Sequence, residues 1–168
     1  YSRAFQMMVK LDRMAVMAGG QVEQVGTPAE VYESPSTAYV ADFLGSANVL
    51  TVEIINSDSA GQTTFRLGAD TLSCRGGGID GTDARLVIRP ERLLLEPPPE
   101  DAGTLEGTVV RTVYQGPTTD VIVRLSSGDE LVVRRPSERV GQHSTGEQVT
   151  VHCRADAMRL LPPGALAD

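Results

Sequence analysis

Four polar residues beside predicted strand ends have side chains that could hold a small ligand. They are Arg89, Glu91, Tyr114 and Gln115. The first two flank a proline directly after the apolar run 86–88, and an arginine fork is well suited to an anion. The other two precede a Gly-Pro pair at the apex of a predicted hairpin, where polar groups can face a ligand. The alternative for the first pair is a structural turn with a surface ion pair worth less than about 1 kcal/mol.

No other residues have the types and spacing of a catalytic or cofactor site. The single lysine, Lys10, stands in no G-x-x-x-x-G-K-[ST] loop, so the sequence predicts no phosphate loop for ATP. His143 and His152 follow no G-x-S-x-G motif, which disfavours a hydrolytic triad. The glycine-rich stretch 76–81 lacks the flanking strand and helix of a dinucleotide site and is predicted to be a loop. We therefore expect no catalytic residue and no cofactor held by this chain.

The two cysteines also give no metal site in the sequence. Cys74 and Cys153 are far apart and neither belongs to a C-x-x-C motif. Such residues are more often buried thiols in a reducing compartment than a disulfide or a metal site. We expect no metal ligands.

Composition excludes several classes of protein. The 168 residues carry a net charge of -7, which argues against a nucleic-acid partner, because binding to phosphates needs clustered lysine and arginine. Only seven residues are aromatic, too few to favour an oligonucleotide-binding fold that stacks on bases. No apolar run approaches the roughly 20 residues that span a bilayer, and no secretory signal is present, so we expect a cytoplasmic protein.

The pattern of the first 45 residues predicts a short α/β segment. The spacing of apolar residues over 5–11 resembles the end of an amphipathic helix, and a glycine turn between 14–17 and 21–25 predicts a hairpin. Thr27 and Glu30 have the spacing of a capping box around Pro28, so a helix should begin there and end at Ser34-Pro35. A second short helix is predicted over 37–43, ended by Gly45.

The rest of the chain has short alternating runs separated by turns, a pattern typical of an all-β barrel or sandwich. The predicted strands are 48–56, 62–67, 71–74, 84–88, 93–95, 105–115, 118–125, 130–134, 148–153 and 158–161. A stretch rich in proline and acid near 96–104 predicts a crossover between two β lobes.

Segments 12–35, 39–45 and 47–50 resemble the end of the ATP-binding subunit of ABC importers, in the branch for polyamines, ferric iron and sugars. Segments 86–91, 107–111, 114–117 and 149–161 are similar to the transport-associated OB-like (TOBE) domain that follows the ATPase in that branch. The resemblance implies a mainly β, OB-like barrel or sandwich preceded by a short α/β remnant of an ATPase domain. It places the remnant at 1–45, with the last ATPase hairpin and a helical connection, and the TOBE-type domain at 46–168.

The resemblance also implies partners. In the family the β domain forms a homodimer that tethers two ATPase domains beneath the membrane permease subunits, at the inner face of the plasma membrane. ATP and Mg belong to the full-length parent, since the phosphate loop, signature motif and catalytic glutamate of the family are absent from this sequence. The leading hypothesis is thus a dimerisation and regulatory module for solute import, with 43–48 slightly more similar to polyamine or iron systems. The alternatives are a β domain that senses an oxyanion or the transported solute and, less favoured, an OB-fold nucleic-acid binder.

Overall fold

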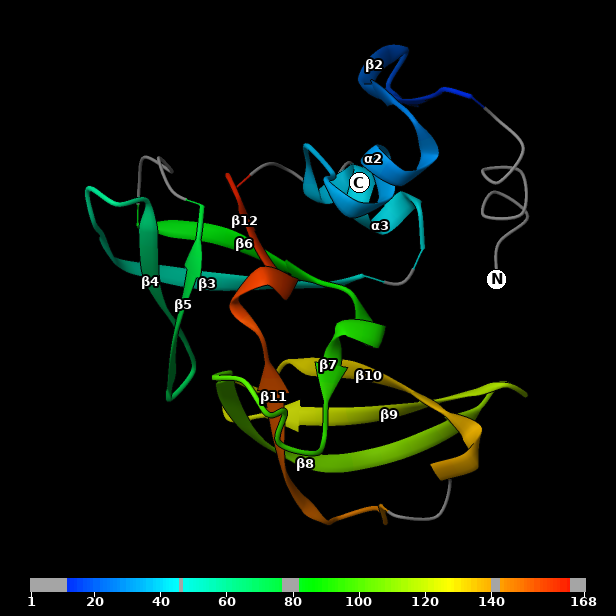
Figure 1. Ribbon diagram of the computed structural model, residues 1–168, viewed down its shortest axis with the longest axis vertical. Coiled ribbons are helices and arrows are strands. Elements are labelled where there is room, and N and C mark those ends of the chain that lie inside the picture. The colour runs from blue at the N-terminus through cyan, green and yellow to red at the C-terminus, as the bar shows by residue number, and fades with distance from the viewer. Residues whose placement is uncertain (1–11, 46, 77–81, 140–142, 164–168) are drawn as a thin grey trace.

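Two β sheets with a small α/β segment at the N-terminal end make up the computed structural model (Figure 1). The structure describes residues 12–45, 47–76, 82–139 and 143–163. The helix end predicted over 5–11 lies outside these residues. The mainly β, OB-like fold class predicted from the sequence is confirmed.

The N-terminal segment contains one hairpin and two short helices. Strand β1 (Met14–Ala18) pairs antiparallel with β2 (Gln21–Gly26), and the helices are α2 (Pro28–Glu33) and α3 (Ala38–Phe43). The predicted capping box is present, because Thr27 Oγ1 accepts from the Glu30 amide at 3.2 Å and Glu30 Oε2 accepts from the Thr27 amide at 2.8 Å. Gly45 follows α3 with a φ of 119°, which agrees with its predicted role in ending that helix.

The first sheet has the strand order β12-β6-β3-β4-β5, and all its neighbouring strands are antiparallel. Its strands are β3 (Asn48–Ser57), β4 (Gln62–Leu67), β5 (Asp70–Arg75), β6 (Asp83–Ile88) and β12 (Met158–Leu161). Although β5 and β12 form opposite edges of this sheet, they contact each other, so the sheet is strongly curled.

The second sheet has the order β10-β9-β8-β11-β7 and is also antiparallel. Its strands are β7 (Leu93–Leu94), β8 (Gly103–Tyr114), β9 (Thr118–Leu125), β10 (Glu130–Pro136) and β11 (Gln148–Cys153). All ten strands predicted from turn residues and alternation are present, each within two residues at both ends.

One hydrophobic core lies between the two sheets. Its buried side chains include Phe65 and Leu86 from the first sheet and Leu105, Val123 and Leu131 from the second, and all five are fully enclosed. Cys74 and Cys153 belong to the same core as free thiols, and burial raises their pKa values to about 11 and about 12. The sheets therefore share a single core.

The chain crosses from one sheet to the other at two short 3₁₀ turns. The first, η1 (Pro90–Arg92), joins β6 to β7, and the second, η3 (Ala155–Ala157), joins β11 to β12. The proline-rich stretch near 96–104 instead joins β7 to β8, which lie in one sheet because β7 pairs with β11. The predicted lobe boundary there does not coincide with a change of sheet.

In the part of the chain that the structure describes, no helix has the length and apolar character needed to cross a bilayer. The same residues contain no group of three or more histidine, cysteine, aspartate or glutamate side chains placed to hold a metal ion.

Candidate functional site

Arg89 holds the two helices against the β sheets. It is the last residue before η1, and only 7% of it is exposed. Its Nη1 donates to the carbonyl oxygens of Ala41 and Gly45 at 3.1 and 2.9 Å, and its Nη2 donates to the carbonyl oxygen of Tyr32 at 2.8 Å. These acceptors lie near the C-terminal ends of α3 and α2, where carbonyls lack helical partners and a cation is favourable.

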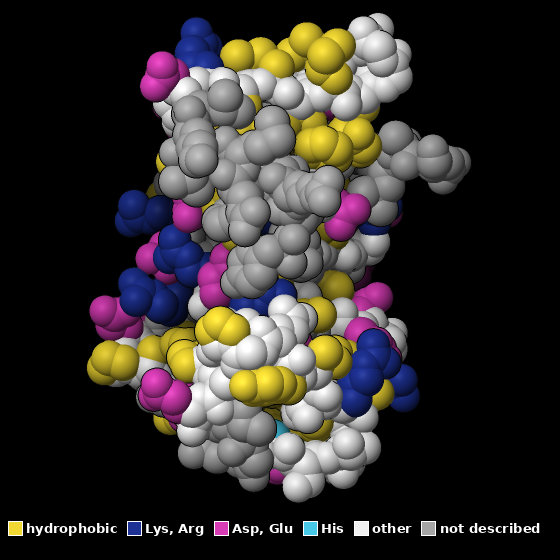
Figure 2. Space-filling model, turned by 90° about the vertical axis from the view of Figure 1, so that its right-hand side faces the viewer, with side chains coloured by type: hydrophobic (Ala, Val, Ile, Leu, Met, Phe, Trp, Pro, Cys, Tyr) yellow, Lys and Arg dark blue, Asp and Glu magenta, His cyan; other side chains and the backbone are white. Residues whose placement is uncertain are grey.

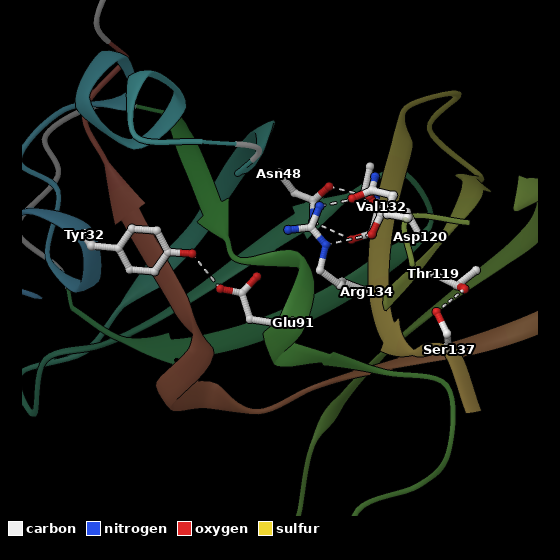
Figure 3. A network of polar contacts seen from close by, with 9 residues as sticks. Tyr32, Asn48, Glu91, Thr119, Asp120, Val132, Arg134 and Ser137 are labelled. Atoms are coloured by element: carbon white, nitrogen blue, oxygen red, sulfur yellow. Dashed lines mark hydrogen bonds and ion pairs between the residues drawn. The ribbon is translucent and has the colours of Figure 1, made fainter. Parts of the chain in front are cut away.

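The aromatic ring of Tyr32 extends this contact. The Arg89 guanidinium lies 4.0 Å from the ring centroid, a cation–π distance. The Tyr32 hydroxyl donates to Glu91 Oε1 at 2.7 Å, and Figure 3 shows the two side chains pointing toward each other. Burial and this hydrogen bond to Glu91 raise the pKa of Tyr32 to about 12, while burial lowers the pKa of Arg89.

A second, exposed contact lies beside the first. Arg92 Nη2 is 3.2 Å from Glu33 Oε2 in an ion pair between η1 and the end of α2. We call Tyr32, Glu33, Arg89, Glu91 and Arg92 the latch. Since three of its residues come from 89–92 and two from α2, the latch fixes the N-terminal helices to the first crossing between the sheets.

Tyr32→Phe is expected to remove part of the loss of stability at alkaline pH. Because the folded-state pKa of Tyr32 lies above the ordinary value of 10, folding retains a proton that the unfolded chain releases, so stability falls as pH rises from 10 toward 12. The raised pKa values of the buried cysteines also lower the stability of the fold as pH rises, beginning at about pH 9.

Urea unfolding followed by circular dichroism between pH 8 and pH 11.5 measures this effect. The variant should lose less stability than the wild type above pH 10, while Tyr114→Phe, at a tyrosine that is 70% exposed, should follow the wild type. Parallel curves for Tyr32→Phe and wild type would contradict the role of the Tyr32 proton.

The other two predicted ligand-binding residues lie elsewhere. Tyr114 ends β8 and is 70% exposed, and the adjacent Gln115 donates through Nε2 to Asp120 Oδ2 at 2.8 Å. Neither makes a contact with Arg89 or Glu91 among the described residues. The structure therefore divides the four predicted residues between two places, and it uses the hydrogen-bond donors of Arg89 on backbone carbonyls.

Sequence reasoning missed two polar contacts that the structure reveals (Figure 3). Asp120 is buried and accepts from Arg134 Nε and Nη2 at 2.8 and 2.9 Å. Asn48, also buried, accepts from the Val132 amide at 2.7 Å and donates to its carbonyl at 2.9 Å, which ties β3 to the edge strand β10. The partners of Asn48 are 84 positions away along the chain, so no local pattern indicates them.

Comparison with known proteins places this architecture in a family. Residues 86–161 match the TOBE domain. The spermidine/putrescine import ATP-binding protein PotA of Roseobacter denitrificans is 34% identical over 155 residues, which cover 89% of this chain and 43% of that protein. The Fe(3+) ions import ATP-binding protein FbpC 1 of Rhizobium meliloti is 36% identical over 128 residues, 76% of this chain and 35% of that protein. Residues 86–161 are a TOBE domain, and most of the chain is similar to the C-terminal part of ABC import ATP-binding subunits.

The chain spans about two fifths of the length of these relatives and matches their C-terminal region. Among solved structures, the cytoplasmic molybdate-binding protein ModG resembles it with a TM-score of 0.57, 17% identity, and coverage of 69% of this chain and 96% of ModG. At this identity the likeness shows the fold alone. Within the latch, 89–92 lie inside the TOBE match and α2 lies before it, so the latch joins the TOBE domain to the segment that precedes it.

Proposed function

We propose that this chain is the C-terminal dimerisation and regulatory module of an ABC importer ATP-binding protein. The TOBE match and the import relatives support the module, and the sequence lacks the motifs that hydrolyse ATP. ATP and Mg are bound by the parent subunit in this proposal. The module works in the cytoplasm at the inner face of the plasma membrane, where its partners are a second copy, the ATPase domain and, indirectly, the permease subunits.

The latch is the observation that carries this function. Arg89 bonds to three carbonyl oxygens of the α2–α3 segment, and the ring of Tyr32 covers its guanidinium. Because a buried arginine with three hydrogen bonds to backbone carbonyls is costly to displace, the helices and the TOBE domain move as one unit. A movement of an ATPase domain attached to the N-terminal segment is thus passed to the β sheets, and a dimer of β sheets keeps two such domains together.

The N-terminal hairpin offers a surface for that ATPase domain. Three apolar side chains of the hairpin, Met17, Val22 and Val25, are about half exposed, and so is Phe43 of the neighbouring helix α3. Figure 2 shows hydrophobic side chains gathered at this end of the molecule. An exposed apolar patch of this kind marks an interaction site. In relatives more than twice as long, we infer that this face packs on the rest of the ATP-binding subunit.

Sedimentation velocity tests the proposed dimer. At micromolar concentrations the 17.9 kDa chain should sediment with the mass of two copies. Arg89→Ala is the control variant. Because the latch lies within one chain, loss of Arg89 should leave the dimer unchanged. A strict monomer for the wild type at high micromolar concentration would overturn the dimer.

A ligand-sensing β domain is the second candidate, favoured by the ModG structure, which was solved with molybdate bound. Since Arg89 is buried and both its Nη atoms donate to backbone carbonyls, the exposed hairpin at Tyr114 and Gln115 is the remaining predicted site for an oxyanion or a transported solute. Calorimetry with molybdate and with spermidine separates the two functions. A ligand-sensing domain should give a heat of binding that Gln115→Ala abolishes. A domain that only tethers the ATPase domains should give no heat of binding that depends on Gln115.

A further inference from the structure

We propose that the cavity between the end of α2 and the first sheet binds a small phosphate monoester. The cavity has a volume of about 380 Å³, within the range of about 300–1,000 Å³ typical of small-molecule sites. The segment from Tyr32 to Pro35 lines the cavity together with the end of β5, the turn η3 and strand β12. This site is separate from the predicted ligand residues at Tyr114 and Gln115.

The lining of the cavity is positively charged in a chain that is otherwise acidic. Four arginines, Arg75, Arg89, Arg92 and Arg159, face two carboxylates, Glu33 and Asp156. The excess of two positive charges contrasts with the net charge of -7 for the whole sequence. Low-dielectric walls lined by one sign of charge concentrate ions of the opposite sign, so this cavity selects anions.

Two of these arginines are available to a ligand. Arg89 is bonded to backbone carbonyls, and Arg92 pairs with Glu33. Asp156 is likewise engaged, because it pairs with Arg154 outside the cavity. The side chains of Arg75 and Arg159 make no ion pair or hydrogen bond with any residue that the structure describes, and both residues are exposed at the cavity. Their guanidinium groups can therefore donate to a bound anion.

The curl of the first sheet brings these two arginines to one cavity. Arg75 ends β5 and Arg159 lies in β12, the two opposite edges of the sheet, yet both line the same space because those edges contact each other. Two planar forks from different directions suit the several oxygens of a phosphate dianion, which accept bidentate hydrogen bonds.

The other residues that line the cavity favour a phosphate ester over inorganic phosphate as the ligand. Val87, Met158 and Leu160 supply apolar surface, and the volume is far larger than one phosphate group requires. A ligand with a dianionic head and a small uncharged body satisfies both features. A polyamine carries the opposite charge and is disfavoured here. Since the ligand would contact α2 and both sheet edges, its binding should strengthen the attachment of the helices to the TOBE domain.

Isothermal titration calorimetry with adenosine 5′-monophosphate as the probe tests this site. We expect saturable binding that is stronger than that of inorganic phosphate, with no binding of adenosine or spermidine. The double variant Arg75→Gln/Arg159→Gln should bind the monophosphate at least about tenfold more weakly, because hydrogen bonds to charged groups are lost. Arg66→Gln, at an exposed arginine of the same sheet that pairs with Glu53, should bind like the wild type.

Absence of saturable binding to the wild type, or equal affinity for the double variant, would overturn the proposal. Melting temperatures by circular dichroism verify that the variants fold, which is expected since both side chains are exposed. The test is independent of the proposed dimer: a strict monomer that binds the monophosphate would refute the dimer and leave this site standing.

Discussion

Arg89→Ala should release α2 and α3 from the sheets and lower the free energy of unfolding by about 3 kcal/mol. The substitution removes a buried guanidinium and leaves the carbonyl oxygens of Tyr32, Ala41 and Gly45 without this donor. Each hydrogen bond to a charged group contributes about 1.5–3 kcal/mol, and partial entry of water into the gap reduces the sum. Urea unfolding followed by circular dichroism measures the total loss, and amide hydrogen exchange locates it.

The positions at which amide exchange increases distinguish a loss of the latch from a general weakening of the core. Amides of α3 should exchange much faster in Arg89→Ala, while those of the central strands β8 and β9 should change only by the global loss. Arg89→Lys keeps the charge but not the fork or the flat face over Tyr32, so it should recover only part of the stability. Arg66→Ala breaks an exposed pair and should cost less than about 1 kcal/mol. Unchanged exchange in α3 would contradict the latch.

Gly68→Ala is expected to cost about 3 kcal/mol by forcing apart two turns that belong to different sheets. Gly68 lies in the turn between β4 and β5 with a φ of 61°, and a Cβ there would lie 2.6 Å from Ser126 Oγ and 2.7 Å from the Ser127 nitrogen. The serine hydroxyl can rotate away, but the backbone nitrogen of the β9–β10 turn can move only if the turn moves. Such overpacking costs about 1–3 kcal/mol in addition to the conformational strain.

Gly61→Ala provides the matched control for this prediction. Gly61 has a φ of 79° in the turn between β3 and β4, and a Cβ there meets nothing within 4 Å. It should therefore show only the strain of a positive φ, about 1–2 kcal/mol. The difference between the two variants in urea unfolding isolates the contact between the sheets. Equal losses would show that the turns do not hold the sheets together.

The local elements were predictable because their causes are local. The capping box of Thr27 and Glu30 defines the start of α2, and glycine turns with alternating apolar residues define the strands to within two residues. The resemblance of 12–50 and of the segments after 86 to import subunits was likewise visible in the sequence. The import relatives, which align over as much as 89% of this chain, and the TOBE match over 86–161 confirm it.

The candidate site was predicted only in part. Arg89 and Glu91 stood out, but as ligand-binding residues, and their contact with Tyr32 joins positions 57 and 59 apart along the chain. The boundary expected near 96–104 followed from proline content, which reports a loop and not which strands pair on either side of it. Strand pairing depends on contacts far apart in the chain, as between β7 and β11.

The sequence by itself determined the elements, the class of fold and the family, because caps, turns and alternation act over a few residues and family motifs are read directly. Only the tertiary structure decided what the polar side chains do. It directed the donors of Arg89 to the ends of two helices, and it curled the first sheet so that Arg75 and Arg159 share one cavity. Both outcomes come from packing two sheets around one core, since that packing sets which distant residues meet.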